Sequence, residues 1–270
     1  VYMEACESGS MFENILEKNI NVYALSAANS SESSWGTYCS PDDKVNGKSV
    51  GSCLGDLFSV NWMEDSDKAK MNKETLQDQF NTVKRETSKS HVLQWGETSW
   101  TTEPIGNFES GNDVSENTDD FWGKFKHIGK NFLKKATKWD EGVSRRKNDY
   151  AIDSRDIKLH YLYNQVLNNP SIEASQALQK ELGERTKVDA QIAEMFPAHI
   201  EAVKARTTPL PTDFECYREL VDTYEAQCGK FTDYSMKYMS ALVAECEGMK
   251  SFPAAREETI KRIGATCNKQ

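Results

Sequence analysis

The sequence has few histidines and no two cysteines in a C-x-x-C spacing. Its four histidines (His91, His127, His160 and His199) lie far apart, and its seven cysteines are widely spaced as well. Structural zinc sites usually take cysteine and histidine ligands from closely spaced pairs. We therefore expect no metal site, and no motif in the sequence indicates another cofactor.

Long apolar runs and an excess of basic residues are also missing. No apolar stretch approaches the roughly 20 residues that span a bilayer, so we expect no transmembrane segment. The chain carries 33 Lys and Arg against 42 Asp and Glu, and residues 1–111 alone have a net charge of −8. Phosphate binding requires the opposite sign, which argues against nucleic acid as a partner.

The chain has neither an initiator methionine nor a signal sequence. It opens on Val1-Tyr2-Met3-Glu4-Ala5, a run that reads as a portion of a strand. We therefore expect that Val1 is a truncation point and that a longer protein continues upstream of it.

Among the features present, Cys6 is the most informative. It ends the strand-like run and precedes the small residues Ser8-Gly9-Ser10 and a helical pattern near 10–17. A thiol between a strand end and a helix N-terminus meets backbone N–H groups and a helix dipole that favour the thiolate. Such a thiolate is a candidate nucleophile, although a strand-end cysteine is more often buried and inert.

The other six cysteines suggest that Cys6 is unpaired. Cys39 and Cys53 flank a polar loop that a disulfide could close, and Cys216, Cys228, Cys246 and Cys267 lie in the C-terminal region. Cys216 and Cys228 fall on one expected helix and cannot pair with each other, whereas the remaining pairings stay open. Three disulfides and one leftover thiol are typical of the oxidising secretory route.

Hydrophobic patterns divide the chain into three regions. Residues 1–111 alternate strand and helix, as in an α/β fold. Residues 112–150 read as a linker that contains a basic amphipathic helix over 121–139, and residues 151–270 show helical stripes only. In the first region the expected strands are 1–5, 21–27 and 91–95, and the expected helices are 10–17, 54–65 and 72–87.

Several ordered motifs resemble the legumain family of asparaginyl cysteine peptidases. They include Glu4-Ala5-Cys6-Glu7-Ser8-Gly9-Ser10, Glu32-Ser33-Ser34-Trp35-Gly36-Thr37-Tyr38-Cys39, Trp62-Met63-Glu64-Asp65-Ser66-Asp67 and Ser90-His91-Val92-Leu93-Gln94-Trp95-Gly96. The resemblance implies the C-terminal half of a caspase-like α/β/α sandwich (a partial peptidase domain, residues 1–111), an activation linker (112–150) and an all-α helical prodomain (151–270). It also implies the disulfides Cys39–Cys53, Cys216–Cys246 and Cys228–Cys267.

The resemblance further implies an endopeptidase zymogen that cleaves after asparagine, and after aspartate at acidic pH. Cys6 would attack the scissile carbonyl to form a thioester, and its backbone N–H would donate to the oxyanion. Glu4 and Asp56 would accept hydrogen bonds from the asparagine amide, and Ser33 would line the pocket wall. Asp56 also fits a helix N-cap.

The family's general base is a histidine that precedes a glycine, and none of the four histidines here does so. His91 falls on an expected later strand, where a structural role is the simpler interpretation. We therefore expect the base to lie upstream and the 270 residues alone to be inactive. An inactive or regulatory homologue and a peptide ligase of the same family remain alternatives. The related GPI-anchor transamidase subunit is another alternative. It lacks the four-cysteine helical prodomain, so the four C-terminal cysteines of this chain argue against it.

The partners implied by the resemblance are peptide substrates with asparagine at the cleavage site, the chain's own prodomain as an intramolecular inhibitor, and cystatin-type inhibitors. The implied route leads through the secretory pathway to a lysosome or vacuole, or out of the cell. For activation we expect a cut after Asn148, with Asp149 and Asp153 as alternatives, in a polar and exposed stretch. Acid would weaken the attraction between the acidic residues 1–111 and the lysine-rich helix 121–139.

Overall fold

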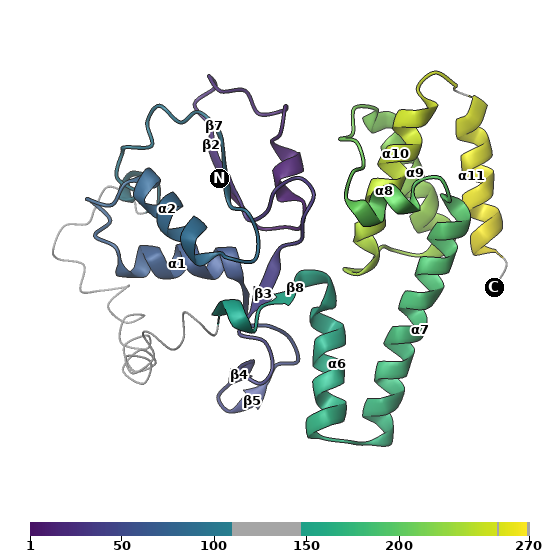
Figure 1. Cartoon of the computed structure of the whole chain (residues 1–270), viewed down its shortest axis with the longest axis horizontal. Helices are drawn as coiled ribbons and strands as arrows, with labels where there is room; N and C mark the ends of the chain where they lie inside the picture. Colours follow the sequence, from purple (N-terminus) through teal and green to yellow (C-terminus); the bar gives the residue numbers. More distant parts are fainter. Residues whose placement is uncertain (110–146, 253, 269–270) are drawn as a thin grey trace. The chain divides into compact units, whose positions relative to one another are not determined.

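The chain forms two compact units, Val1–Ile157 and Lys158–Gln270, in a computed structural model that describes residues 1–109, 147–252 and 254–268 (Figure 1). The first unit is mixed α/β and the second is helical. This confirms the expected fold class, an α/β region followed by a helical one. The basic helix expected over 121–139 lies outside the described residues.

A small sheet at the centre of the first unit has the strand order β1-β2-β7. β1 (Tyr2–Met3) runs parallel to β2 (Tyr23–Ser26), and β2 runs antiparallel to β7 (Leu93–Gly96). Every residue of β2 is buried, and the strand is paired on both edges. The hydrophobic cluster of this unit includes Leu25, Phe58, Leu76, Phe80, Val83 and Val92.

Two α-helices follow in the order that the sequence predicts. α1 (Leu57–Lys68) and α2 (Leu76–Glu86) correspond to the helices expected over 54–65 and 72–87. α2 begins with a capping box, in which Thr75 Oγ1 accepts the Asp78 N–H and the Asp78 carboxylate accepts the Thr75 N–H. A short helix, α3 (Gly106–Glu109), ends the first described range.

The helix expected over 10–17 does not form, and this prediction is wrong. A single 3₁₀ turn, η1 (Ser8–Met11), stands in its place. The backbone enters the left-handed region at Glu7 (φ 51°) and at Asn14 (φ 58°), which interrupts any helix on both sides. Cys6 therefore precedes a 3₁₀ turn rather than an α-helix.

A second small sheet has the order β6-β3-β8 and joins distant segments of the chain. β3 (Trp35–Thr37) pairs antiparallel with β6 (Gly55–Asp56) and with β8 (Ile152–Asp153). Only helix was predicted beyond residue 150, and β8 corrects that prediction. A strand of two residues is too short to show a periodic pattern, so nothing in the sequence distinguishes it.

The loop between Cys39 and Cys53 carries a small hairpin. β4 (Lys44–Val45) pairs with β5 (Lys48–Ser49) across the turn Asn46-Gly47, where both residues have positive φ. This is the sequence and geometry of a two-residue type I′ hairpin turn. The disulfide at its base closes the loop, as the sequence suggested.

The second unit is a helical assembly around one buried cluster. Its helices are α6 (Ile157–Asn168, which starts at the last residue of the first unit), α7 (Ile172–Met195), α8 (Ile200–Ala205), α9 (Phe214–Cys228), α10 (Met239–Met249) and α11 (Ala254–Cys267). A 3₁₀ turn, η3 (Ser235–Tyr238), precedes α10, and another, η2 (Ser154–Asp156), precedes α6 at the end of the first unit. The largest buried side chains of the cluster are Ile192, Met195, Phe196, Leu220, Leu242 and Ile263.

Ser171 caps α7, since its Oγ accepts the Ala174 N–H at 3.0 Å. The helix passes through Gly183 without interruption and continues to Met195. Gly183 is exposed with open space around it, so its missing side chain removes no contact.

The structure contains the three disulfides that the resemblance implied. Cys39–Cys53 lies in the first unit, while Cys216–Cys246 and Cys228–Cys267 tie α9 to α10 and to α11. Cys6 is the free cysteine, and it is partly buried.

Peptide mapping tests this arrangement. Under native, non-reducing conditions iodoacetamide should modify Cys6 alone, and digestion should release Cys39–Cys53, Cys216–Cys246 and Cys228–Cys267 as linked pairs. Reduction in denaturant before labelling provides the control, in which all seven cysteines react. A bridge that includes Cys6 would contradict both the structure and its interpretation as a nucleophile.

Candidate active site

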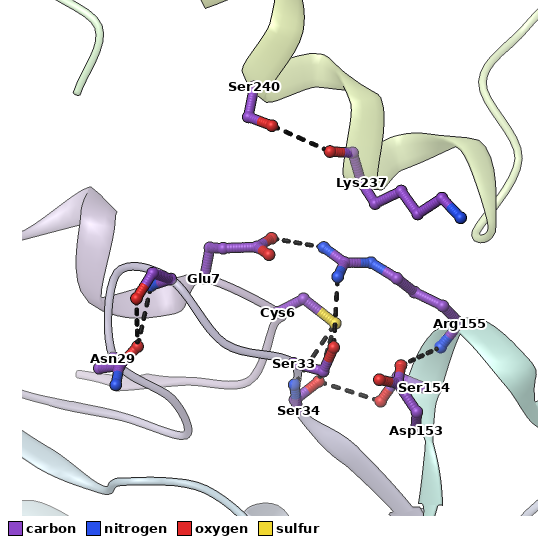
Figure 2. A network of polar contacts seen from close by, with 11 residues as sticks. Cys6, Glu7, Asn29, Ser33, Ser34, Asp153, Ser154, Arg155, Lys237 and Ser240 are labelled. Carbon is purple, nitrogen blue, oxygen red and sulfur yellow. Dashed lines mark hydrogen bonds and ion pairs between the residues drawn. The ribbon is translucent and has the colours of Figure 1, made fainter. Parts of the chain in front are cut away.

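Cys6 lies just beyond β1, against the start of β3. Its Sγ accepts the Ser34 backbone N–H at 3.4 Å and lies 3.6 Å from Ser34 Oγ (Figure 2). Ser34 Oγ lies 3.0 Å from Ser154 Oγ, so the environment of the thiol includes a residue from the far side of the linker. The backbone N–H of Ser34 therefore holds the sulfur against the start of β3.

Arg155 is the cation of this site. Its Nη2 lies 2.5 Å from Glu7 Oε2, and its Nη1 donates to Ser33 Oγ at 3.2 Å, as Figure 2 shows. Burial alone would lower the pKa of Arg155, but the hydrogen bond and charge of Glu7 outweigh burial, the charge of Cys6 adds to them, and the net shift is upward. A permanent positive charge therefore stands beside the thiol.

The short turn η2 holds Arg155 in place. The Asp153 carboxylate accepts the Arg155 N–H at 3.0 Å, and the Ser154 N–H donates to the Ser34 carbonyl at 3.1 Å. Together with the pairing of β8 and β3, these bonds fix the segment 152–155 across the residues that surround Cys6.

Glu4 is the second titratable group of interest. Its Oε2 accepts both the Ser59 N–H at 2.8 Å and the Ser59 hydroxyl at 2.9 Å. Ser59 lies in the first turn of α1, whose N–H groups have no partner within the helix, so Glu4 caps α1 from outside. Asp56 occupies the N-cap position, but its side chain makes no capping bond.

Burial raises the pKa of Glu4 to about 7, although the two Ser59 bonds oppose this shift and the charge of Asp56 adds to it. Burial also raises the pKa of Asp56. The second oxygen of Glu4, Oε1, is buried and has no hydrogen-bond partner among the described residues. An unpaired buried acceptor is costly, and a ligand that donates a hydrogen bond would relieve that cost.

The structure thus groups the predicted residues in two pairs. Arg155 interacts with both Cys6, through its charge, and the buried Ser33, through a hydrogen bond. Near the start of α1, the charge of Asp56 raises the pKa of Glu4. The role of each residue in binding a substrate stays a prediction.

No hydrogen bond joins a histidine to Cys6 within the ranges that the structure describes. His91 precedes β7 and is exposed, with its Nδ1 2.8 Å from Glu32 Oε2 and its N–H bonded to Glu32 Oε1. The Glu32 carbonyl accepts the Glu7 N–H at 2.7 Å, so this pair connects β7 with the residue after Cys6. His127 lies outside the described residues.

The expected processing residues differ in accessibility. Asn148 is half-buried, Asp149 is exposed, and Asp153 is paired in β8. The preceding residue, Lys147, is buried, so the expectation of a uniformly exposed stretch is wrong.

Sequence reasoning missed Glu7, Ser34, Ser154 and Arg155 as members of the site. Arg155 lies 148 residues from Glu7 in the chain, and no local motif marks such a contact. The sequence offers only a weak signal for Arg155, which is its position two residues after Asp153, a candidate processing residue.

Two family models match the chain in sequence order. The model described as "Peptidase C13 family" matches residues 1–124, and the model described as "Legumain, prodomain" matches residues 176–263. The chain belongs to the legumain family, peptidase family C13. The second match falls within the helical unit, whose residues 176–263 are thus similar to the legumain prodomain.

Vacuolar-processing enzymes of plants are similar over nearly the whole chain. The delta-isozyme of Arabidopsis thaliana is 34% identical over 287 residues, which cover 99% of this chain and 57% of that protein. The beta-isozyme 1 of Oryza sativa subsp. indica is 31% identical, with 98% and 53% covered, and the enzyme of Citrus sinensis is 32% identical, with 91% and 50% covered. The chain thus spans about half the length of these relatives.

Neither a metal centre nor a membrane span is found among the described residues. The ranges 1–109, 147–252 and 254–268 contain no group of three His, Cys, Asp or Glu side chains placed to hold a metal ion. None of the helices within these ranges is long and apolar enough to pass through a bilayer.

Replacing Glu4 with glutamine tests its buried charge. Since the folded-state pKa of about 7 exceeds the ordinary value of 4.5, the folded chain takes up a proton between these pH values and is penalised above them. Glu4→Gln should therefore raise the free energy of unfolding by roughly 2–3 kcal/mol at pH 8 and change it little below pH 4.5. Urea titrations followed by tryptophan fluorescence measure this.

Glu13→Gln is the matched control, because Glu13 also accepts a serine hydroxyl but neither of its oxygens is both buried and without a hydrogen-bond partner. An equal loss of stability at both pH values in Glu4→Gln would mean that the ionised carboxylate is a favourable cap for α1.

Proposed function

We propose that this chain is the nucleophile-bearing portion of a cysteine endopeptidase zymogen that cleaves peptide bonds after asparagine. The proposal depends on two features that lie two residues apart in the chain. Cys6 has a free thiol whose sulfur accepts a backbone N–H, and Glu4 has a buried carboxylate oxygen without a hydrogen-bond partner. The family membership supports a peptidase, and the names of the plant relatives suggest a vacuolar or lysosome-like compartment.

The pocket chemistry follows from what an asparagine side chain presents. Its amide NH₂ would donate to Glu4 Oε1 and to Asp56, which removes the cost of leaving that oxygen unpaired. A pocket built around such a hydrogen bond strongly rejects side chains that cannot make it. Because the pKa of Glu4 is about 7, acid would protonate this carboxyl and let it donate to an aspartate, which accounts for aspartate cleavage at low pH.

In the proposed reaction the Cys6 thiolate attacks the scissile carbonyl carbon. The Cys6 N–H donates to the oxyanion, the amine leaves with a proton from the general acid, and a thioester remains. Water then attacks the thioester, releases the carboxyl product and restores the thiol. Since no described histidine bonds to Cys6, the proposal assigns the general base to a histidine outside the described residues.

The segment 152–155 keeps this site closed in the zymogen. It pairs with β3, and it places Ser154 and Arg155 on the residues that surround Cys6. An extended substrate would need the same edge of β3 and the same polar groups. Substrate entry and the Glu7–Arg155 ion pair are therefore mutually exclusive in the proposed mechanism.

Acid acts in opposite directions on two sets of carboxylates. In the helical unit the pKa values of Glu181 and Glu245 are lowered, because lysine, arginine, threonine and histidine partners outweigh the burial that would raise them. In the first unit burial would raise the pKa of Glu64, but its hydrogen bonds with Lys147 and Tyr38 outweigh burial and lower it. Stability from these three carboxylates is present above the ordinary pKa and is lost as the pH falls through the lowered value, which supports activation by acid. Glu4 and Asp56 have raised pKa values, so acid relieves their penalty.

Activity of the longer protein that supplies the base tests the proposed reaction. A peptide with asparagine at the cleavage position should be hydrolysed, the aspartate analogue only at acidic pH, and the glutamine analogue at neither pH. Cys6→Ala should abolish turnover, because the residual rate without the nucleophile falls by several orders of magnitude. The 270 residues alone, which should lack the histidine general base, are the control and should show no turnover. Undiminished turnover by Cys6→Ala would exclude this cysteine as the nucleophile.

Loss of the Arg155 charge tests the closed state. Arg155→Met removes the ion pair with Glu7, so the segment 152–155 should open more easily over Cys6. If the free energy of opening falls by about 1.4 kcal/mol, the alkylation rate of Cys6 should rise about tenfold. The native rate of each protein is divided by its rate in denaturant, so that the ratio reports the accessibility of Cys6. Arg256→Met, which removes an arginine paired with Glu219 on α9, is the matched control. Equal rates for both variants and the parent would show that the segment does not cover the thiol.

A further inference from the structure

The loop that the disulfide Cys39–Cys53 closes is hydrogen-bonded to the rest of the first unit only at its base. Among the described residues, those of the range 42–51 form hydrogen bonds within the loop alone, such as the bond from the Val50 N–H to the Asp43 carbonyl at 2.9 Å. Most of these residues are exposed. The direction in which the loop leaves the unit therefore depends on the residues at its base.

Tyr38 is the base residue with the unusual backbone. It lies between β3 and Cys39, and its φ of 53° falls in the left-handed region, which a residue with a side chain rarely adopts. Its carbonyl accepts the Leu54 N–H at 3.2 Å, and its hydroxyl donates to Glu64 Oε1 at 2.6 Å. A strained backbone persists only where its surroundings fix it, and the bond to Glu64 is such a constraint.

The other oxygen of Glu64 binds a residue from beyond the linker. Lys147 is 4% exposed, and its Nζ lies 2.6 Å from Glu64 Oε2 and 3.2 Å from Asn61 Oδ1. Burial alone would raise the pKa of Glu64, but its hydrogen bonds with Lys147 and Tyr38 lower it, so this carboxylate is ionised in the folded chain. One charged group on α1 thus serves two distant segments, one through each oxygen.

The segment that carries Lys147 is docked by further contacts. The Lys147 carbonyl accepts the hydroxyl of Thr37, the residue before Tyr38, at 3.2 Å. The Asn148 side chain accepts the N–H and the hydroxyl of Ser88, and it donates to a carbonyl at the end of α2 at 2.9 Å. Loss of one partner of a buried ion pair leaves an uncompensated charge, so Glu64 cannot keep its position once Lys147 has left.

We propose that Glu64 couples the docking of residues 147–148 to the conformation of the Cys39–Cys53 loop. While Lys147 is docked, Glu64 is fixed and holds the Tyr38 hydroxyl. When Lys147 leaves, Glu64 turns toward water, the bond to Tyr38 breaks, and the base of the loop opens more often. This coupling does not depend on catalysis.

One consequence rests on the proposed function. There, a substrate needs the edge of β3, and the loop follows directly after that strand. Docking of residues 147–148 would then hold this loop closed in the zymogen, in addition to the cover that the segment 152–155 places over Cys6.

Hydrogen exchange of the Leu54 amide in the 270-residue chain, followed by NMR, tests the coupling. Tyr38→Phe should raise the Leu54 rate about tenfold, which corresponds to about 1.4 kcal/mol. Lys147→Met should raise it at least threefold, although neither Tyr38 nor Leu54 is changed. The double variant should stay within twofold of Tyr38→Phe, because the connection through Glu64 is already broken. The Ala27 amide, bonded to the Met3 carbonyl, reports the stability of the whole unit.

Two matched controls should leave the Leu54 rate at the parent value. Lys158→Met removes a largely exposed lysine that pairs with Glu181, and Tyr23→Phe removes a hydroxyl that binds Gln94. Should Lys147→Met fail to fold, as judged by its melting curve, Asn148→Ala replaces it, because it weakens docking without leaving a buried charge. It should raise the Leu54 rate as well, and not in the Tyr38→Phe background.

Three results would overturn the proposal: a parental Leu54 rate in the variant that weakens docking, a double variant whose effect is the product of the two single effects, or an equal rise at Ala27. The measurement needs no turnover. A coupled Leu54 rate in a chain whose longer form does not cleave after asparagine would uphold the coupling and refute the proposed function. An active longer form with uncoupled rates would do the opposite.

Discussion

Arg155 carries a charge that is largely removed from water, and the charge stays there because Glu7 supplies its counterion at 2.5 Å. The pair joins Glu7, the residue after Cys6, to the segment 152–155, whose Arg155 lies 148 residues later in the chain. Around it the chain arranges the Ser33 hydroxyl, the Ser34 donor to sulfur and the β3–β8 pairing. A buried ion pair of this kind contributes little net stability, but it fixes one arrangement, because every alternative leaves a buried charge alone.

The same principle separates Glu245 in the helical unit from Glu4 in the first unit. Glu245 in the helical unit is surrounded by donors from His199, Thr259 and Arg262, which favour its ionised form. Glu4 has the Ser59 donors on one oxygen and none on the other, so burial prevails. Evenly satisfied carboxylates keep a fold together at neutral pH, whereas a half-satisfied one favours a ligand that can donate to it.

Much of this could be predicted from local signals. The free thiol follows from the count and placement of the cysteines, and α2 follows from its capping box and the apolar positions Leu76, Phe80 and Val83. The helix expected after Cys6 failed because apolar spacing says nothing about the left-handed backbone at Asn14. Lys147 looked like any lysine of a polar linker, since its partner Glu64 lies 83 residues away and burial is a property of the fold.

The placement of the disulfides determines which parts of the molecule stay covalently joined if the backbone between the two units is cut. One bridge lies wholly within the first unit and the other two lie wholly within the helical unit, so no disulfide spans the two units. Each unit also has its own buried hydrophobic cluster. A single hydrolysed bond between them would therefore yield two products, each with its own core and its own cross-links.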